Sequence, residues 1–97
     1  MNITGIVWLR DVVDKLAWKH QITPDEVEQV FAGQPRFKFA ERGRFRGEDV
    51  YAALGQTDAG RYLIVWFVHK ATGEALVLSA RDMDRKERRQ YGKKQRL

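Results

Sequence analysis

The sequence predicts one α+β domain with two N-terminal helices, an antiparallel sheet of three to four strands and a basic C-terminal helix. Three observations predict this fold class. Apolar residues recur with a helical period in the first third of the chain. They recur with a period of two in the middle of the chain, and a dense run of cations forms its C-terminal end. At 97 residues, with no low-complexity linker, residues 1–97 are expected to form a single domain.

The N-terminal third predicts a short strand and two helices. The apolar run Gly5–Leu9 favours an edge strand, and Asp11–His20 carries a helical stripe. The next helix begins at Thr23, because "TPDE" supplies an N-cap hydroxyl, a proline in the first turn and a carboxylate that completes a capping box. Gly33 and Pro35 end this helix.

The middle of the chain predicts strands joined by tight loops. From Arg36, "RFKFAERGRFRG" alternates basic and aromatic residues. Three strands follow, Val50–Gln56, Arg61–His69 and Glu74–Ala80, joined by the glycine-containing loops "TDAG" and "KATG". The run "YLIVWFV" is apolar at odd and even positions alike, which indicates a central strand covered on both faces.

Symmetric closure of the two hairpins gives a register by counting. His69 would lie opposite Glu74, and Val50 and Leu76 would both lie beside Phe67 on one face of the sheet. A single bulge would exchange the two faces, because side chains alternate along a strand.

The net charge of +5 lies entirely at the C-terminal end. Residues 81–97 hold eight Lys/Arg and three Asp/Glu, whereas residues 1–80 hold ten of each sign. This asymmetry predicts a polyanionic partner, either nucleic acid or an acidic protein, with a merely solvated tail as the alternative.

Composition also indicates a compartment. The chain has no cysteine and no apolar run near the roughly 20 residues that span a bilayer. The N-terminus "MNITGIVWLR" lacks the features of a signal peptide. We therefore expect a cytoplasmic protein with no membrane association and no cofactor.

Several segments resemble the BrnT family, small RelE-like ribonucleases of bacterial type II toxin–antitoxin pairs. These are Lys19-His20, "EVEQVF", "GEDVYAALG" and above all "LSARDMDRKERRQY". The likeness spans roughly Lys15 to Tyr91. It implies a compact RelE-like fold, cleavage of mRNA without a metal ion, and neutralisation by a ribbon-helix-helix (BrnA-like) antitoxin.

The chain departs from the family pattern at two strand positions. Relatives usually carry arginine where this chain has Val50 and Leu76. The nearby "RGRFRG" segment, with Arg42, Arg44 and Arg46, could supply the missing charge. A non-catalytic RNA- or protein-binding module on the same scaffold is therefore the alternative function.

Arg81 is the strongest candidate for a catalytic cation. We expect it to leave the sheet at the start of the last helix, where backbone amides favour a phosphate. Arg85, four residues on, could share that phosphate. Asp82 or Asp84 could instead cap the helix and occupy the same amides.

The two histidines are the candidate proton carriers, because histidine is the residue type that titrates near neutral pH. His20 ends a helix, which favours a capping role. His69 ends the central strand opposite Glu74, so catalysis and a cross-strand ion pair explain it equally well. Neither has the spacing of a metal ligand.

Together these considerations give candidate catalytic and RNA-binding sets. The catalytic candidates are Arg81, His69 and Arg46. The predicted RNA contacts are Lys19, His20, Arg44, Arg85, Arg88 and Arg89, with Lys93 and Lys94 as non-specific phosphate contacts or solvated charge. Tyr91 is expected to pack rather than to react.

Overall fold

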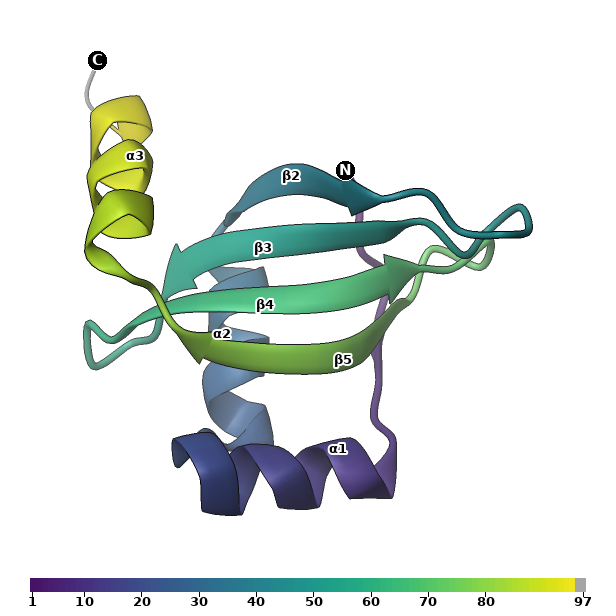
Figure 1. Cartoon of the computed structure of the whole chain (residues 1–97), viewed down its shortest axis with the longest axis horizontal. Coiled ribbons are helices and arrows are strands. Elements are labelled where there is room, and N and C mark those ends of the chain that lie inside the picture. The colour runs from purple at the N-terminus through teal and green to yellow at the C-terminus, as the bar shows by residue number, and fades with distance from the viewer. Residues whose placement is uncertain (96–97) are drawn as a thin grey trace.

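The computed structural model describes residues 1–95, and the side chains of Lys94 and Gln95 lie outside what it describes. The chain forms an α+β domain around a five-stranded sheet with the order β1-β5-β4-β3-β2 (Figure 1). The strands are β1 (Ile6–Val7), β2 (Arg36–Glu41), β3 (Val50–Gln56), β4 (Tyr62–His69) and β5 (Ala75–Asp82). The α-helices are α1 (Arg10–Lys15), α2 (Pro24–Ala32) and α3 (Arg85–Gln95).

Strands β2 to β5 form the expected antiparallel sheet of four strands, and β1 adds a fifth strand that makes the sheet mixed. The basic-aromatic segment forms the edge strand β2, and β1 runs parallel to β5 at the other edge. The backbone amide of Ala75 donates to the carbonyl of Gly5 at 2.9 Å, which docks β1. The two helices that follow β1 carry the chain across one face of the sheet to β2 at the opposite edge.

Two helical segments cover one face of the sheet. α1 continues as a π-helical turn, Leu16–His20, and α2 begins with the expected capping box. The Glu26 amide donates to the Thr23 hydroxyl at 3.2 Å, and the Thr23 amide donates to the Glu26 carboxylate at 3.0 Å. The core between these helices and the sheet includes the fully buried side chains of Leu16, Val27 and Phe67.

Both hairpins close one residue tighter than counting predicted. Thr57 pairs with Arg61 and Lys70 with Glu74 through backbone hydrogen bonds of 2.9 Å, which leaves three-residue loops. Each loop ends in a glycine with positive φ, Gly60 at 91° and Gly73 at 94°, as this loop class requires.

The predicted register is therefore wrong by one residue. His69 lies opposite Ala75 rather than Glu74, and Val50 lies opposite Val68 rather than Phe67. Leu76 also pairs with Val68, so Val50 and Leu76 do flank one residue, but on the face opposite Phe67.

A bulge in β5 shifts the register once more. Phe67 pairs with Val77 and Trp66 with Ser79, so Leu78 is the extra residue and its side chain is exposed. Beyond the bulge, Ala80 faces the helix-covered core and Arg81 faces the other side of the sheet, beside Ile64.

The second face of the sheet is covered at one end by α3. Met83 and Tyr91 are buried there against Leu54 and Ile64. β5 continues through Asp82 and α3 begins at Arg85, so Arg81 belongs to the strand and does not start the helix. Asp84 caps α3, because its carboxylate accepts from the Glu87 amide at 2.8 Å. None of the described helices has the length and apolarity needed to cross a bilayer.

Candidate functional site

A surface cavity lies at the end of the sheet away from α3. Its volume is about 520 Å³, and we call it the rim cavity. The loop after β2 and the hairpin between β4 and β5 meet at this end (Figure 1). The cavity brings together Arg46 and His69, two of the three predicted catalytic residues, with Tyr51 and Lys70 beside them.

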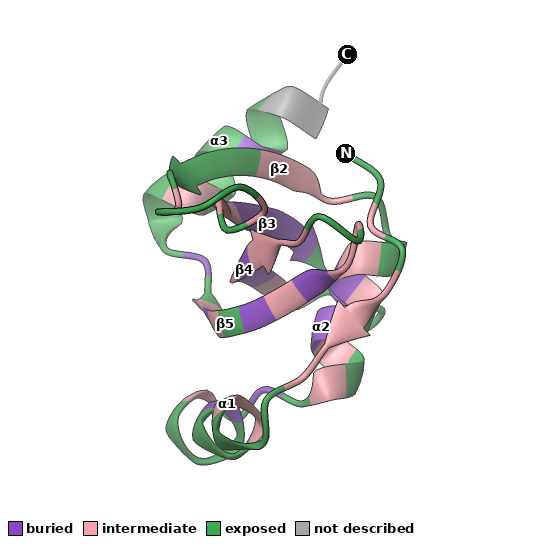
Figure 2. Ribbon diagram, turned by 90° about the vertical axis from the view of Figure 1, so that its right-hand side faces the viewer, coloured by how far each residue is buried: buried purple, intermediate pink, exposed green. Residues whose placement is uncertain are grey.

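Asp49 holds the loop that carries Arg46 against the sheet. The Asp49 carboxylate accepts from the Gly43 amide at 2.8 Å, and its carbonyl accepts from the His69 amide at 3.1 Å. Gly47, at φ 79°, supplies the left-handed turn within this loop. Figure 2 faces this end and shows the exposed loop against the partly buried strands.

The imidazole of His69 is uncommitted to structural bonding. Its Nε2 atom is buried and has no hydrogen-bond partner among the described residues. A buried polar atom without a partner costs about 1–3 kcal/mol, and such atoms call for a functional explanation. The expected ion pair with Glu74 does not form, since Thr72 donates a hydrogen bond to the Glu74 carboxylate at 2.9 Å.

Aromatic rings form a row that leads from the core to this cavity. Tyr51 stacks on Phe67 with ring centroids 6.1 Å apart and meets His69 edge-on at 6.1 Å. Phe39 contacts Tyr51 at 5.6 Å and is 54% exposed. The row fixes the plane of the His69 ring and leaves an aromatic surface open to solvent beside it.

Arg81 lies on the opposite face and is paired within the protein. Its guanidinium donates to both oxygens of the Glu87 carboxylate, at 2.8 and 2.9 Å, and lies 5.0 Å from the ring centroid of Trp66. The hydrogen bond with Glu87 raises the pKa of Arg81, and the same bond holds the pKa of Glu87 below its usual range. Arg81 thus ties α3 to β5 and cannot meet the same phosphate as His69.

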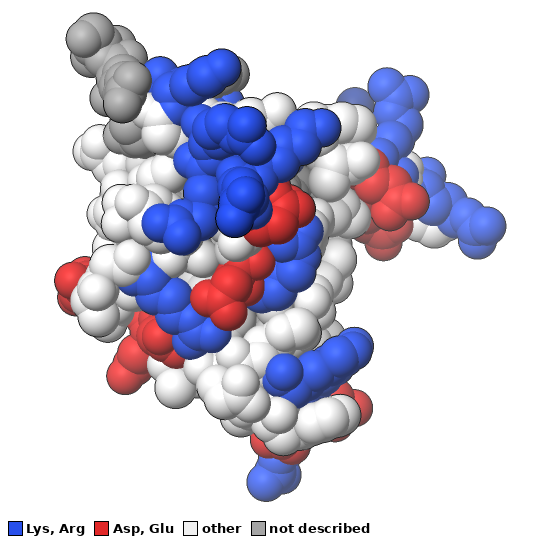
Figure 3. Space-filling model, turned by 60° about the vertical axis from the view of Figure 1, so that its left-hand side comes forward, with Lys and Arg blue, Asp and Glu red and all other residues white. Residues whose placement is uncertain are grey.

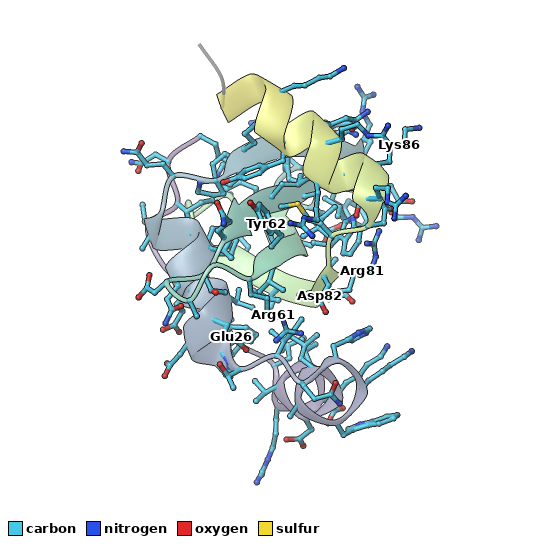
Figure 4. The ribbon with its side chains drawn as sticks, turned by 90° about the vertical axis from the view of Figure 1, so that its left-hand side faces the viewer. Glu26, Arg61, Tyr62, Arg81, Asp82 and Lys86 are labelled. Atoms are coloured by element: carbon cyan, nitrogen blue, oxygen red, sulfur yellow. The ribbon has the colours of Figure 1, made fainter. Side chains whose placement is uncertain are left out.

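Arg61 is a charged residue that the sequence did not single out. Its guanidinium donates to Asp82 at 2.7 and 3.0 Å, to Glu26 at 3.3 Å, and to the carbonyls of His20 and Gln21 at 2.9 and 2.8 Å (Figure 4). Its hydrogen bond to Asp82 is the main reason that the pKa of this carboxyl is lowered. No local pattern could have revealed this hub, since Glu26 lies 35 residues away and Asp82 lies 21 residues away.

The remaining predicted RNA contacts fall in three places. Lys19 is exposed and His20 is half-buried at the end of the π-helical turn, where the His20 carbonyl binds Arg61. Arg44 is exposed on the loop that carries Arg46. The exposed cations of α3, seen as a cluster in Figure 3, are Arg85, Lys86, Arg88, Arg89 and Lys93.

Val50 and Leu76 belong to one apolar row of the sheet. Val50, Val68 and Leu76 lie side by side across three strands on the face that α3 partly covers. This row provides no cation, so the uncompensated positive charge on this face comes from β2 and α3.

These features define a small basic α+β protein with a histidine-arginine cavity at one end of its sheet and a cationic helix at the other. Residues 1–95 contain no group of three or more potential metal-ligating side chains. Residues 13–87 match the family model described as the ribonuclease toxin BrnT of a type II toxin–antitoxin system, so the chain belongs to the BrnT family. This membership implies an RNA substrate and an antitoxin partner. No curated protein matches the sequence.

Proposed function

We propose that the protein is a metal-independent endoribonuclease that cleaves mRNA at the rim cavity and so inhibits translation and growth. The observation that carries this proposal is the meeting of His69 and Arg46 in one cavity, although 23 positions separate them in the chain. The salt bridges found among residues 1–95 include neither Arg46 nor Lys70, so both charges remain available to a phosphate.

Each side chain has a defined task in this reaction. His69 takes the proton from a ribose 2′-hydroxyl, and the 2′-oxygen forms a bond to the adjacent phosphorus. Arg46 stabilises the extra negative charge on the pentacoordinate phosphorus. The bond to the 5′-oxygen then breaks, and this oxygen takes up a proton. The products carry a 2′,3′-cyclic phosphate and a 5′-hydroxyl.

The rest of the surface supports RNA delivery and inhibition. The α3 cations and Arg44 would contact phosphates without reading sequence. The order of helices and strands fits a RelE-like fold. The basic surface fits a ribbon-helix-helix antitoxin with acidic side chains, and the protein would act in the cytoplasm.

A non-catalytic binding module is the second candidate. The apolar row of Val50, Val68 and Leu76 favours it, because two cations that relatives would place there are absent. Arg81 does not replace them, since Glu87 neutralises its charge.

Expression of the protein alone, followed by RNA cleavage in vitro, tests the proposal. Growth should slow, and purified protein should cut RNA equally well with and without EDTA. Loss of cleavage in EDTA, restored by a divalent ion, would overturn the metal-independent reaction. Binding of RNA with no cleavage at any protein concentration would establish the binding module instead.

A further inference from the structure

A second cavity lies between α3 and the sheet, at the opposite end from His69. Its volume is about 690 Å³, and we call it the helix cavity. Tyr62 and Gln56 line it from the sheet, and Met83 and Tyr91 close its base. Seven residue steps of β4 separate Tyr62 from His69, which corresponds to roughly 23 Å along the strand.

Three arginines of α3 line the helix cavity, and their charges are not neutralised by neighbours. Arg85, Arg88 and Arg89 take no part in the salt bridges found within residues 1–95. The one acidic residue of α3, Glu87, is bound to Arg81 instead. The cavity therefore offers several available cations beside an aromatic wall.

The flat guanidinium group of Arg88 covers one face of the Tyr62 ring, and both side chains line the helix cavity. The guanidinium carbon of Arg88 lies 4.2 Å from the ring centroid of Tyr62, and Tyr91 meets Tyr62 edge-on at 6.0 Å. Burial raises the pKa of Tyr91, in keeping with a packing role that supports Tyr62. Nucleobases stack on tyrosine rings and on guanidinium planes, and the bases must be unpaired to do so.

Gly92 leaves room at the cavity. It lies within α3 and lines the cavity, and an added Cβ atom would meet no heavy atom within 4 Å. Glycine inside a helix costs about 1 kcal/mol relative to alanine. Packing within the protein does not require glycine here. A ligand that enters the cavity would require the space that a larger side chain would fill.

We propose that the helix cavity is a second RNA subsite, which binds one unpaired nucleotide by stacking its base on the guanidinium of Arg88, which Tyr62 supports from below, and by holding its phosphate at Arg85 and Arg89. The proposal deepens the proposed function, because it rests on RNA as the substrate, but it does not require cleavage at His69. RNA would then be held at both ends of β4. Single-stranded RNA would be preferred over duplex, since only unpaired bases can stack in this way.

Binding of a fluorescein-labelled 2′-O-methyl oligouridine tests the subsite in the full-length protein. This probe has no 2′-hydroxyl, so its affinity is independent of the proposed cleavage reaction. Arg88→Gln, Tyr62→Leu and Gly92→Leu should each raise its Kd at least about fivefold, the lower end of a stacking contribution. Tyr62→Phe keeps the ring and Lys15→Gln removes a distant charge, so both should stay within about twofold of the unaltered protein.

The variants also separate the alternatives. If Tyr62→Leu fails to fold in thermal melts, Arg88→Gln and Gly92→Leu still decide, because both positions are exposed. Equal effects of Arg88→Gln and Lys15→Gln would reduce the site to general charge attraction and overturn the proposal. Equal affinity for duplex and single-stranded RNA would also overturn the proposal. So would full displacement of the probe by polyglutamate, if these variants abolish the binding of polyglutamate; that result would favour an acidic protein ligand.

Discussion

The two ends of β4 carry polar side chains whose hydrogen-bonding groups are satisfied in opposite ways. Just before its first residue, Arg61 bonds two carboxylates and two carbonyls of the protein itself. At its last residue, His69 has an unpartnered buried nitrogen among the described residues, with Arg46 in the same cavity. A cation that is fully bonded internally holds the fold together, and one that is not can serve a ligand.

Substitutions in the rim cavity should have the largest effect on RNA cleavage. His69→Ala should lower the cleavage rate at saturating RNA by about 10²-fold or more, because a positioned base contributes at that scale. Arg46→Ala should reduce the rate similarly, and thermal melts should show that both variants remain folded at the assay temperature.

Arg81→Ala is the matched comparison for that experiment. It should change the rate at saturating RNA far less, since Glu87 already neutralises Arg81 on the other face. A rate loss from Arg81→Ala as large as that from His69→Ala would move the active site to the α3 face.

The next largest effect concerns stability at the other end of β4. Arg61→Ala should lower the free energy of unfolding by about 2 kcal/mol, because it leaves two carboxylates and two carbonyls without their donor. Urea denaturation measures this change. Arg46→Ala serves as the control, and an equal loss there would show that the two arginines do not differ in kind.

Acidification should reveal the carboxylates that the arginines hold. The pKa of Glu87 is lowered in the folded protein, so its stabilising contribution is complete above the usual value of 4.5 and is lost as pH falls through the folded pKa. Melting temperatures between pH 7 and pH 3 should fall less steeply for Glu87→Gln than for the unaltered protein. Parallel curves would mean that the bond to Arg81 adds nothing to stability.

The smallest effect concerns α3. Gly92→Ala should raise the free energy of unfolding by about 0.5 kcal/mol, because alanine favours a helix and its Cβ meets open space. Thermal melts measure the gain. A loss of stability would indicate that the helix cavity is tighter than its lining suggests.

Local signals predicted the parts of this fold that depend on neighbours in sequence. The capping box of Thr23 and Glu26 was read from four consecutive residues and is confirmed. The edge strand β2 showed its period of two but not its place in the sheet. The fold class could be predicted from the sequence, because helix caps and the alternation of residues in strands depend on only a few neighbouring residues.

Features set by distant contacts were out of reach. The register failed because the loops "TDAG" and "KATG" do not reveal whether three or four residues turn the chain, and because the bulge at Leu78 has no sequence marker. Arg61 and Arg81 read alike as surface cations until the fold brought carboxylates to both. The meeting of Arg46 with His69 likewise required the loop that Asp49 anchors.

The bulge at Leu78 acts as a phase shift in the chain. If Leu78 paired with Trp66 while Phe67 stayed paired with Val77, every later position of β5 would change sides. Arg81 would then point into the helix-covered core and Ala80 toward α3. Loss of Leu78 would instead leave Ala80 in the core and Arg81 beside Ile64, because Trp66 already pairs with Ser79; the bulge thus lets the strand carry one residue more without burying a cation.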